Sequence, residues 1–236
     1  MFKSIYITIC AIAFATCVPS TVIAESFDYR FDVRLGLAKI GEMQVKANND
    51  GKSYSVATVL YTTGLVGALY DVRYDQASIG RIGVGGALVP VRHTATNDER
   101  GTISKLEILF SGDRVSSVTF DPVKTVPAEV TTFRHTVDPM SLMYFLLRPA
   151  SVAKVCTGEV ELFDGRSRSN VKFTDIKRYN DGRVECSILY SGNGGNGGKV
   201  GIALSSLVFM PDNNGLMQIQ NFEANTSIGT LKIKAR

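Results

Sequence analysis

Apolar and polar side chains alternate strictly from Phe27 to Leu35, which is the period of a β-strand with one buried face. The same alternation returns in short segments along the chain, and turns containing Asn, Asp or Gly separate them. The predicted strands are 27–35, 39–47, 53–61, 72–79, 88–96, 102–110, 115–120, 158–163, 167–176, 184–190, 199–209, 216–222 and 228–234. Short consecutive strands joined in this way predict an antiparallel meander rather than alternating strands and helices.

Two segments depart from the strand pattern. Residues 63–70 are small and apolar enough for a short helix or a tight corner. In 138–147, Asp138 is placed to cap a helix, Pro139 takes its first position and Pro149 stops it. This second helix is apolar on nearly all sides, so we expect it to be buried as a plug or a lid. The residues expected to act in that role are Met140, Leu142, Met143, Phe145 and Leu146.

A sheet of about a dozen strands rarely stays flat and open. The predicted fold is therefore an all-β, curled antiparallel meander, a barrel or half-barrel, with one or two short helices. Residues 25–236 are long enough to form one such domain with its own core. The geometry predicts an interior cavity. Because the chain has no tryptophan and many small residues, the sequence leaves open whether side chains or a ligand fill that cavity.

The first 24 residues have the pattern of a secretory signal peptide. Lys3 precedes an apolar stretch that Pro19 interrupts before it reaches the roughly 20 residues of a membrane span. We expect cleavage after Ala24, export to a bacterial periplasm, and no transmembrane segment in the remaining chain. Lipidation at Cys17 is the less favoured alternative, because an aromatic residue and a threonine precede it where an aliphatic residue and a Gly, Ala or Ser are usual.

Charge and composition give no sign of a nucleic-acid partner. The formal net charge is +4, and loss of Lys3 with the leader lowers it by one. Acidic and basic residues are interspersed along the chain rather than grouped into a basic patch. We therefore expect no binding to nucleic acid.

Of the four cysteines, two leave with the leader, and Cys156 and Cys186 remain. An even pair in an oxidising compartment most simply forms a disulfide. A redox or metal-binding pair is the alternative, but the spacing is not C-x-x-C and no histidine lies nearby in the sequence. We expect a disulfide between these two residues, and neither a metal nor a cofactor.

Two further patterns resemble functional motifs, and both have a simpler explanation. Residues 192–197 match the dinucleotide-binding pattern G-x-G-x-x-G, and Lys199 follows as in a phosphate loop. The alternation after them predicts a strand rather than the helix that such a motif must open, so a flexible hairpin loop is favoured. His93 and His135 lie in Arg-His-Thr triplets without an acidic cluster or a zinc motif, which favours satisfied or surface histidines over catalytic or metal-binding ones.

The remaining candidate sites combine arginines with aromatic or acidic residues. Asp164 and Gly165 separate two strands and predict a tight hairpin. Arg166 and Arg168 are two positions apart, so they share a face and could bind phosphate or carboxylate, although alternating arginines on a solvated sheet are common. Around the first corner, aromatic and guanidinium groups suggest a glycan site. The candidate ligand-binding residues are Tyr70, Arg73, Tyr74, Arg92, Asp164, Arg166 and Arg168.

Over nearly all of its length after the leader, the chain resembles an exported family known as domain of unknown function 3108. The resemblance lies in the order and spacing of seven segments: 31–36, 40–42, 62–74, 90–92, 138–141, 163–166 and 228–231. It implies an exported β protein of Gram-negative envelopes, similar to curled-sheet periplasmic proteins that handle lipoproteins or capsule, with no assigned reaction and no catalytic residues to transfer. The chain departs from the family at Arg92-His93, where Arg-Tyr is frequent, and in a longer loop at 192–198.

These observations favour a binding or chaperone-like protein that shelters an apolar envelope molecule, a lipid or a lipid-linked glycan. The alternative is a scaffold that binds another envelope protein or peptidoglycan through its outer face or sheet edge. An exposed aromatic patch around Tyr70, Tyr74 and Phe133 would favour the scaffold. The third hypothesis, a hydrolase, requires Asp, His and Arg side chains clustered across strands.

Overall fold

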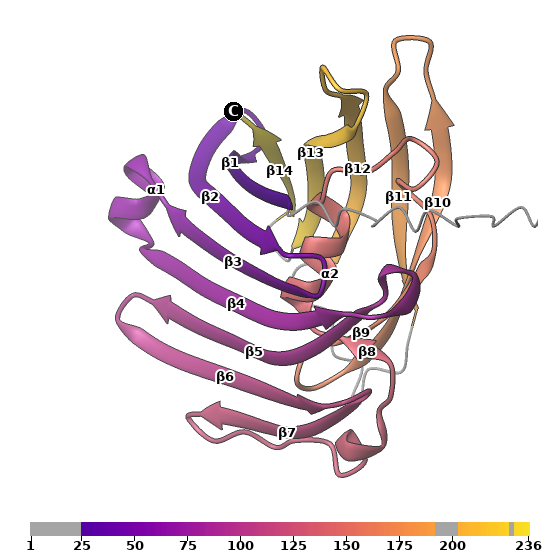
Figure 1. The fold of residues 1–236 in the computed structure, drawn as a ribbon. Helices are drawn as coiled ribbons and strands as arrows, with labels where there is room; N and C mark the ends of the chain where they lie inside the picture. The colour runs from indigo at the N-terminus through magenta and orange to yellow at the C-terminus, as the bar shows by residue number, and fades with distance from the viewer. Residues whose placement is uncertain (1–24, 192–202, 227–228) are drawn as a thin grey trace, which may run out of the picture.

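The computed structural model describes residues 25–191, 203–226 and 229–236, and fourteen strands in this part of the chain form one curled sheet (Figure 1). The first half is a meander of β1 (Glu25–Leu35), β2 (Ala38–Asn49), β3 (Ser53–Thr62), β4 (Val72–Ile82), β5 (Leu88–Glu99), β6 (Thr102–Ser111) and β7 (Arg114–Asp121). The second half contains β8 (Thr136–Val137), β9 (Glu159–Phe163), β10 (Arg168–Arg178), β11 (Val184–Ser191), β12 (Ala203–Pro211), β13 (Met217–Thr226) and β14 (Gly229–Ala235).

The two halves join through their first and last strands. The sheet order is β7-β6-β5-β4-β3-β2-β1-β14-β13-β12-β11-β10-β9-β8. Consecutive strands are therefore neighbours in the sheet, except β7 and β8, which form its two edges. In the β1–β14 pair, Val33 lies opposite Ile233 and both side chains are buried. The predicted antiparallel meander is confirmed. The exception is β8, a two-residue strand that the sequence did not predict and that runs parallel to β9.

The two edges of the sheet approach each other at a seam between β7 and the segment that leads into β8. Val115 N donates to Phe133 O at 3.3 Å, and His135 N donates to Asp113 O at 2.7 Å. A 3-10 turn, η2 (Val130–Thr132), covers the seam from the side. These contacts nearly close the sheet into a barrel, as the predicted fold class required.

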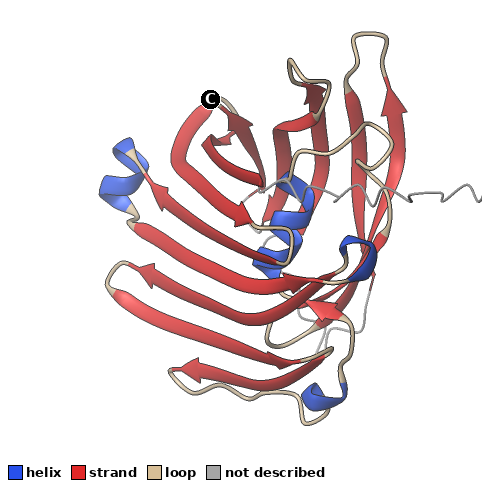
Figure 2. Cartoon of the chain, in the orientation of Figure 1, coloured by secondary structure: helices blue, strands red, loops and turns tan. Residues whose placement is uncertain are grey.

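Two α-helices interrupt the strands, at the positions that the sequence predicted. α1 (Gly64–Leu69) joins β3 to β4 at the rim and has no buried residue. α2 (Pro139–Leu147) lies within the curled sheet (Figure 2), and its N-cap Asp138 accepts from the backbone N–H groups of Met140 and Ser141. The predicted capped and buried helix is confirmed, and it is a plug inside the barrel rather than a lid over it.

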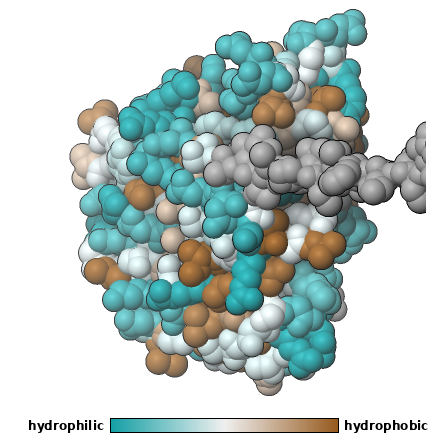
Figure 3. Space-filling model, viewed as in Figure 1, coloured by the Kyte–Doolittle hydropathy of each residue, from teal (hydrophilic) through white to brown (hydrophobic). Residues whose placement is uncertain are grey.

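The barrel interior is mostly filled by side chains. In the main core the rings of Phe31 and Phe222 meet edge to face at 5.5 Å, and Tyr54 stacks on Tyr144 of α2 at 5.0 Å. Burying a large apolar side chain contributes about 1.5–3 kcal/mol, so this packing stabilises both the wall and the plug. On the face seen in Figure 3, hydrophobic residues form small separate groups between hydrophilic areas. Side chains therefore occupy most of the predicted interior cavity.

Several sequence predictions fall outside the described residues. These are the signal peptide 1–24, the glycine-rich segment 192–198, the beginning of the strand predicted for 199–209, and Ile228 at the start of the last strand. The described part of the strand at 199–209 begins at Ala203. No helix in the described ranges is long and apolar enough to cross a membrane.

Candidate functional site

A cleft of about 610 Å³ lies where α2 ends, on the side of the barrel that carries η1 (Val84–Gly86), the turn between β4 and β5. We name it the α2 cleft. Most of its lining is apolar and comes from α2, the segment that follows it, β10, β12 and the turn before β13. The apolar side chains are Phe145, Leu146, Pro149, Ala150, Val155, Phe173, Phe209 and Leu216. A second concavity, of about 730 Å³, lies at the ends of β1 to β5, and its lining combines polar residues such as Asn48 and Arg81 with the apolar Ile79 and Val91.

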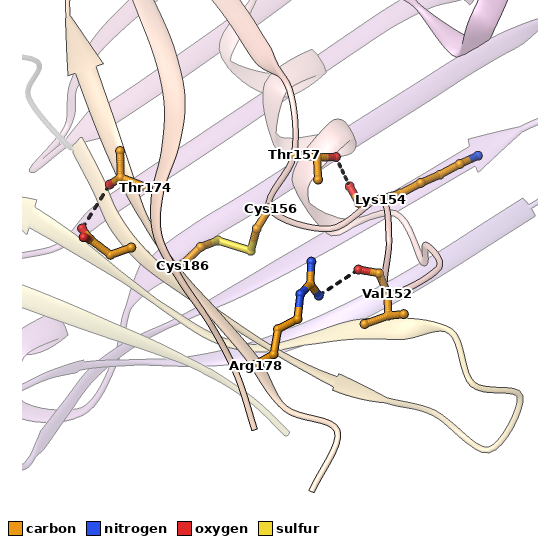
Figure 4. The surroundings of a disulfide bond; sticks show 8 residues. Val152, Lys154, Cys156, Thr157, Thr174, Arg178 and Cys186 are labelled. Carbon is orange, nitrogen blue, oxygen red and sulfur yellow. Dashed lines mark hydrogen bonds between the residues drawn. A yellow bond between two sulfur atoms is a disulfide. The ribbon is translucent and has the colours of Figure 1, made fainter. Parts of the chain in front are cut away.

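The segment after α2 forms one wall of the cleft, and three contacts hold it in place. Its backbone pairs with β13, since Ala150 N donates to Met217 O at 3.3 Å and Met217 N donates back at 2.8 Å. The disulfide between Cys156 and Cys186 ties it to β11, with a Cα–Cα distance of 6.1 Å (Figure 4). Arg178 of β10 also donates to the carbonyl of Val152 at 3.1 Å. The predicted disulfide is confirmed, and it anchors a wall of the cleft.

Two cations complete the lining of the α2 cleft. Arg148 is the C-cap of α2, and its guanidinium lies 5.0 Å from the ring centroid of Phe145. Lys154 belongs to the disulfide-anchored segment. None of the residues that line the cleft in the described part of the chain is acidic. The cleft thus combines an apolar surface with two positively charged residues in its lining.

A buried polar cluster holds the other end of α2 against the barrel wall. We name it the Asp138 cluster, and its members are Tyr54 of β3, Ser78 of β4, His93 of β5, Asp138, and Ser141 of α2. Both Ser78 and Ser141 donate a hydroxyl hydrogen to the Asp138 carboxylate. Nδ1 of His93 lies 3.3 Å from the carboxylate and 3.0 Å from the hydroxyl of Ser78. Tyr54 bonds the hydroxyl of Ser141 at 2.6 Å.

The hydrogen-bond donors around Asp138 determine the protonation state of its carboxyl group. Asp138 also accepts the backbone N–H groups of Met140 and Ser141, each at 2.9 Å. Because the hydroxyl hydrogen of Ser78 goes to Asp138, Nδ1 of His93 must carry the hydrogen that it shares with Ser78. Complete burial opposes ionisation of Asp138, but these donors, His93 foremost, outweigh it and lower the pKa of the carboxyl. The group is an ionised, acceptor-only anchor.

The cluster contains Ser, His and Asp, but it differs in geometry from the triad of serine hydrolases. In that triad the serine meets Nε2 of the histidine and the aspartate meets Nδ1. Here Ser78 and Asp138 both meet Nδ1 of His93, and all three side chains are at most 2% exposed. The cluster also contains no arginine, which the hydrolase hypothesis required. Its geometry is that of a structural anchor.

The sequence predicts satisfied or surface histidines. His93 lies in this buried cluster, whereas the side chain of His135 is 80% exposed. The cluster itself was not predicted. The inward phase of His93 on its strand was a usable signal, because Ala95 follows on the same buried face. In the described residues, no three His, Cys, Asp or Glu side chains are grouped so that they could hold a metal ion.

The ligand-binding candidates of the first corner and of β5 lie apart from the cleft. Arg73 forms a bidentate pair with Asp75, at 2.7 and 2.8 Å, and Arg92 pairs with Glu107 at 2.7 Å. The hydroxyl of Tyr74 donates to Glu99 at 2.7 Å. Tyr70 is exposed beside α1, and the guanidinium of Arg100 lies 6.0 Å from its ring centroid. These polar groups have local partners, and the structure does not bring them together at one site.

The candidates around the β9–β10 turn also have local partners. Asp164 accepts from Arg166 N at 2.8 Å and from Ser167 N at 2.7 Å, so it forms the turn. Arg166 lies over the ring of Phe120 at 5.3 Å. Arg168 lies over the ring of Phe133 at 5.7 Å and pairs with Glu161.

The aromatic residues considered for a scaffold surface do not form one patch either. Phe133 packs edge to face on Phe163 at the seam, at 5.4 Å, whereas Tyr70 and Tyr74 lie beside the α1 corner.

Of the residues predicted for the helix plug, Met140 and Leu142 are buried and Met143 is half-buried among core side chains. Phe145 and Leu146 reach the α2 cleft.

Comparison with known proteins supports the fold and identifies the family. The model of the family described as "Protein of unknown function (DUF3108)" matches residues 30–236. No curated protein matches the chain. Among solved structures, a β-barrel-like protein of the domain of unknown function DUF1849 from Brucella abortus is similar, with a TM-score of 0.51 at 12% sequence identity. The match covers 91% of this chain and 96% of that one.

Proposed function

The chain belongs to the DUF3108 family of proteins of unknown function, and from this premise we propose that it is a non-enzymatic periplasmic protein that binds an apolar envelope molecule, a lipid or a lipid-linked glycan. The α2 cleft is the observation that carries the proposal. Its volume, about 610 Å³, falls within the roughly 300–1,000 Å³ typical of small-molecule sites. Its lining combines a large apolar surface with a few polar groups, as such sites do.

The construction of the cleft also supports a binding role. Side chains fill most of the barrel interior, so a ligand would lie at the mouth and be held by the end of α2. The wall opposite α2 is fixed by a disulfide and by paired backbone bonds, which limits the entropy lost when a ligand binds. The disulfide fits an oxidising compartment, which agrees with the leader expected in residues 1–24.

Native mass spectrometry combined with organic extraction tests the proposal. The protein is purified from a bacterial periplasm without detergent, and we expect one lipid or glycolipid per chain to accompany it. Recovery of a chain that carries no lipid and binds none when offered envelope lipids would refute the proposal and shift the search to protein partners by crosslinking.

A cleft-filling substitution ties any ligand to this location. Ala150 lines the α2 cleft, so Ala150→Trp should exclude the co-purifying molecule while the melting temperature stays close to that of the wild type. Ala57→Trp on the exposed outer face of β3 is the matched control and should retain the ligand. Equal ligand occupancy in both variants would place the binding site elsewhere.

A further inference from the structure

The charges at the α2 cleft are unbalanced, because its described lining includes Arg148 and Lys154 and no acidic residue. Several strand arginines and lysines elsewhere pair with a carboxylate, as Arg73 does with Asp75 and Arg92 with Glu107. Within residues 25–191, 203–226 and 229–236, neither Arg148 nor Lys154 has an ion pair with a carboxylate. Both line the same mostly apolar cleft.

We propose that the α2 cleft binds an amphiphile that has an aliphatic portion and an anionic head group, a carboxylate or a phosphate, with Arg148 and Lys154 as the residues that contact the head. This inference rests on the proposed function and adds the class of ligand. A guanidinium can offer two parallel N–H donors to such a head, and an ammonium adds a compact charge. The aliphatic portion would lie against Phe173, Phe209 and Leu216.

The C-terminus of α2 opposes an anion at this cleft. Its last carbonyl groups carry the equivalent of about half a negative charge, and that effect fades within the last turn. Arg148 follows the last helical residue as the C-cap, and its side chain carries a full positive charge. Lys154 carries a second one. Two full charges outweigh the opposing half charge, so the edge of the cleft remains favourable for an anion.

Calorimetric titration of the wild-type chain with matched dodecyl compounds tests the head-group class. The probes are dodecyl phosphate, dodecyl maltoside and dodecyltrimethylammonium, all kept below the concentrations at which they form micelles, together with inorganic phosphate. We expect dodecyl phosphate to bind about three- to tenfold more tightly than the neutral maltoside, as two partly exposed charge pairs allow, and the ammonium compound to bind most weakly. Inorganic phosphate alone should bind far more weakly than dodecyl phosphate.

Each departure from this order has a distinct meaning. Equal binding of the three dodecyl compounds would overturn the anionic head group and leave the apolar cleft standing. No binding by any of them would overturn both this inference and the proposed function. Inorganic phosphate that binds as tightly as dodecyl phosphate would show a site for a free anion and refute the amphiphile.

A double variant assigns the preference to the two cations. Arg148→Gln with Lys154→Gln should remove the preference for dodecyl phosphate over the maltoside and leave maltoside binding unchanged. Lys105→Gln with Lys177→Gln removes the same charge from exposed positions on β6 and β10 and should keep the preference. A preference that survives the first double variant, or is lost equally in the second, would refute the assignment.

Discussion

Replacing Asp138 with alanine should destabilise the protein strongly, because one side chain serves the helix cap and the buried cluster at once. The carboxylate accepts two backbone N–H groups of α2, two serine hydroxyls and the imidazole of His93. Loss of an N-cap costs about 0.5–2 kcal/mol. Each buried donor left without an acceptor costs about 1–3 kcal/mol before relaxation.

The structure therefore sets the expected loss of unfolding free energy at about 3–5 kcal/mol, which combines the lost cap with the buried donors that no longer have an acceptor. For a chain of this length that corresponds to a fall of about 6–20 °C in melting temperature. Asp138→Asn keeps the size of the side chain and one carbonyl acceptor, so its effect should be smaller. Urea unfolding followed by circular dichroism gives both values. A loss below about 1 kcal/mol in the alanine variant would refute the anchoring role.

The pH dependence supplies a second test of the same group. Hydrogen bonds depress the pKa of folded Asp138, so its ionised form adds stability above the unfolded pKa, and that stability is lost as pH falls through the folded pKa. The difference in unfolding free energy between the wild type and Asp138→Asn should therefore be constant from pH 7 to about pH 5 and shrink below about pH 4. A difference that stays constant to pH 3 would mean that folding does not lower the pKa of Asp138, which would contradict the hydrogen-bonded carboxylate.

Three further predictions concern other parts of the barrel. Cys156→Ser should lower the melting temperature to that of the reduced wild type, since a bridge over a sequence separation of 30 stabilises by about 3–4 kcal/mol; equal melting of oxidised and reduced wild type would refute a stabilising bridge. Gly80→Ala should lower the free energy of unfolding in urea by about 1–3 kcal/mol, because a Cβ there would lie 2.5 Å from the buried ring of Tyr54. Gly83→Ala is the control, since its Cβ would lie 3.5 Å from the nearest neighbouring atom. Equal losses in the two variants would contradict the packing explanation. Hydrogen bonds from Lys39, Arg236 and Tyr61 lower the pKa of Glu42 to about 2; a carboxyl NMR titration should show this and an increase in Arg236→Gln, whereas an ordinary pKa in the wild type would contradict the ion-pair cluster.

The elements that the sequence predicted well are those whose signal is local. The alternation from Phe27 to Leu35 reports burial of one face, and it remains visible whichever strand lies opposite. The second helix was predictable for the same reason, since Asp138 and Pro139 define its start without reference to the rest of the chain. The strand Thr136–Val137 was missed because two residues carry no period, and its pairing depends on a strand 25 residues further along.

The candidate ligand-binding residues have local partners and do not meet at one site, for a related reason. Arg73 was considered a ligand-binding residue, although Asp75 stands two positions away on the same strand face and satisfies it. The pairing of Arg73 with Asp75 could therefore have been predicted from the sequence. The α2 cleft could not, because Gly85, Phe145 and Leu216 meet there only once the sheet has curled. A period of two tells which face a side chain occupies, and it does not tell which distant segment covers that face.

The two unpredicted features, the Asp138 cluster and the α2 cleft, lie at opposite ends of one helix. Nine residues of α-helix span about 13 Å, so the cluster at the N-cap determines where Phe145 and Arg148 stand at the other end. This explains why a carboxylate is kept in the barrel interior, where an apolar side chain of similar size would often be as stable. The helix is apolar on nearly every side, and apolar packing alone permits it to slide or rotate. Hydrogen bonds from β4 and β5 to the Asp138 carboxylate, together with the bond from Tyr54 of β3 to Ser141, have a single geometry. They fix the helix in one position and thereby fix the floor of the cleft.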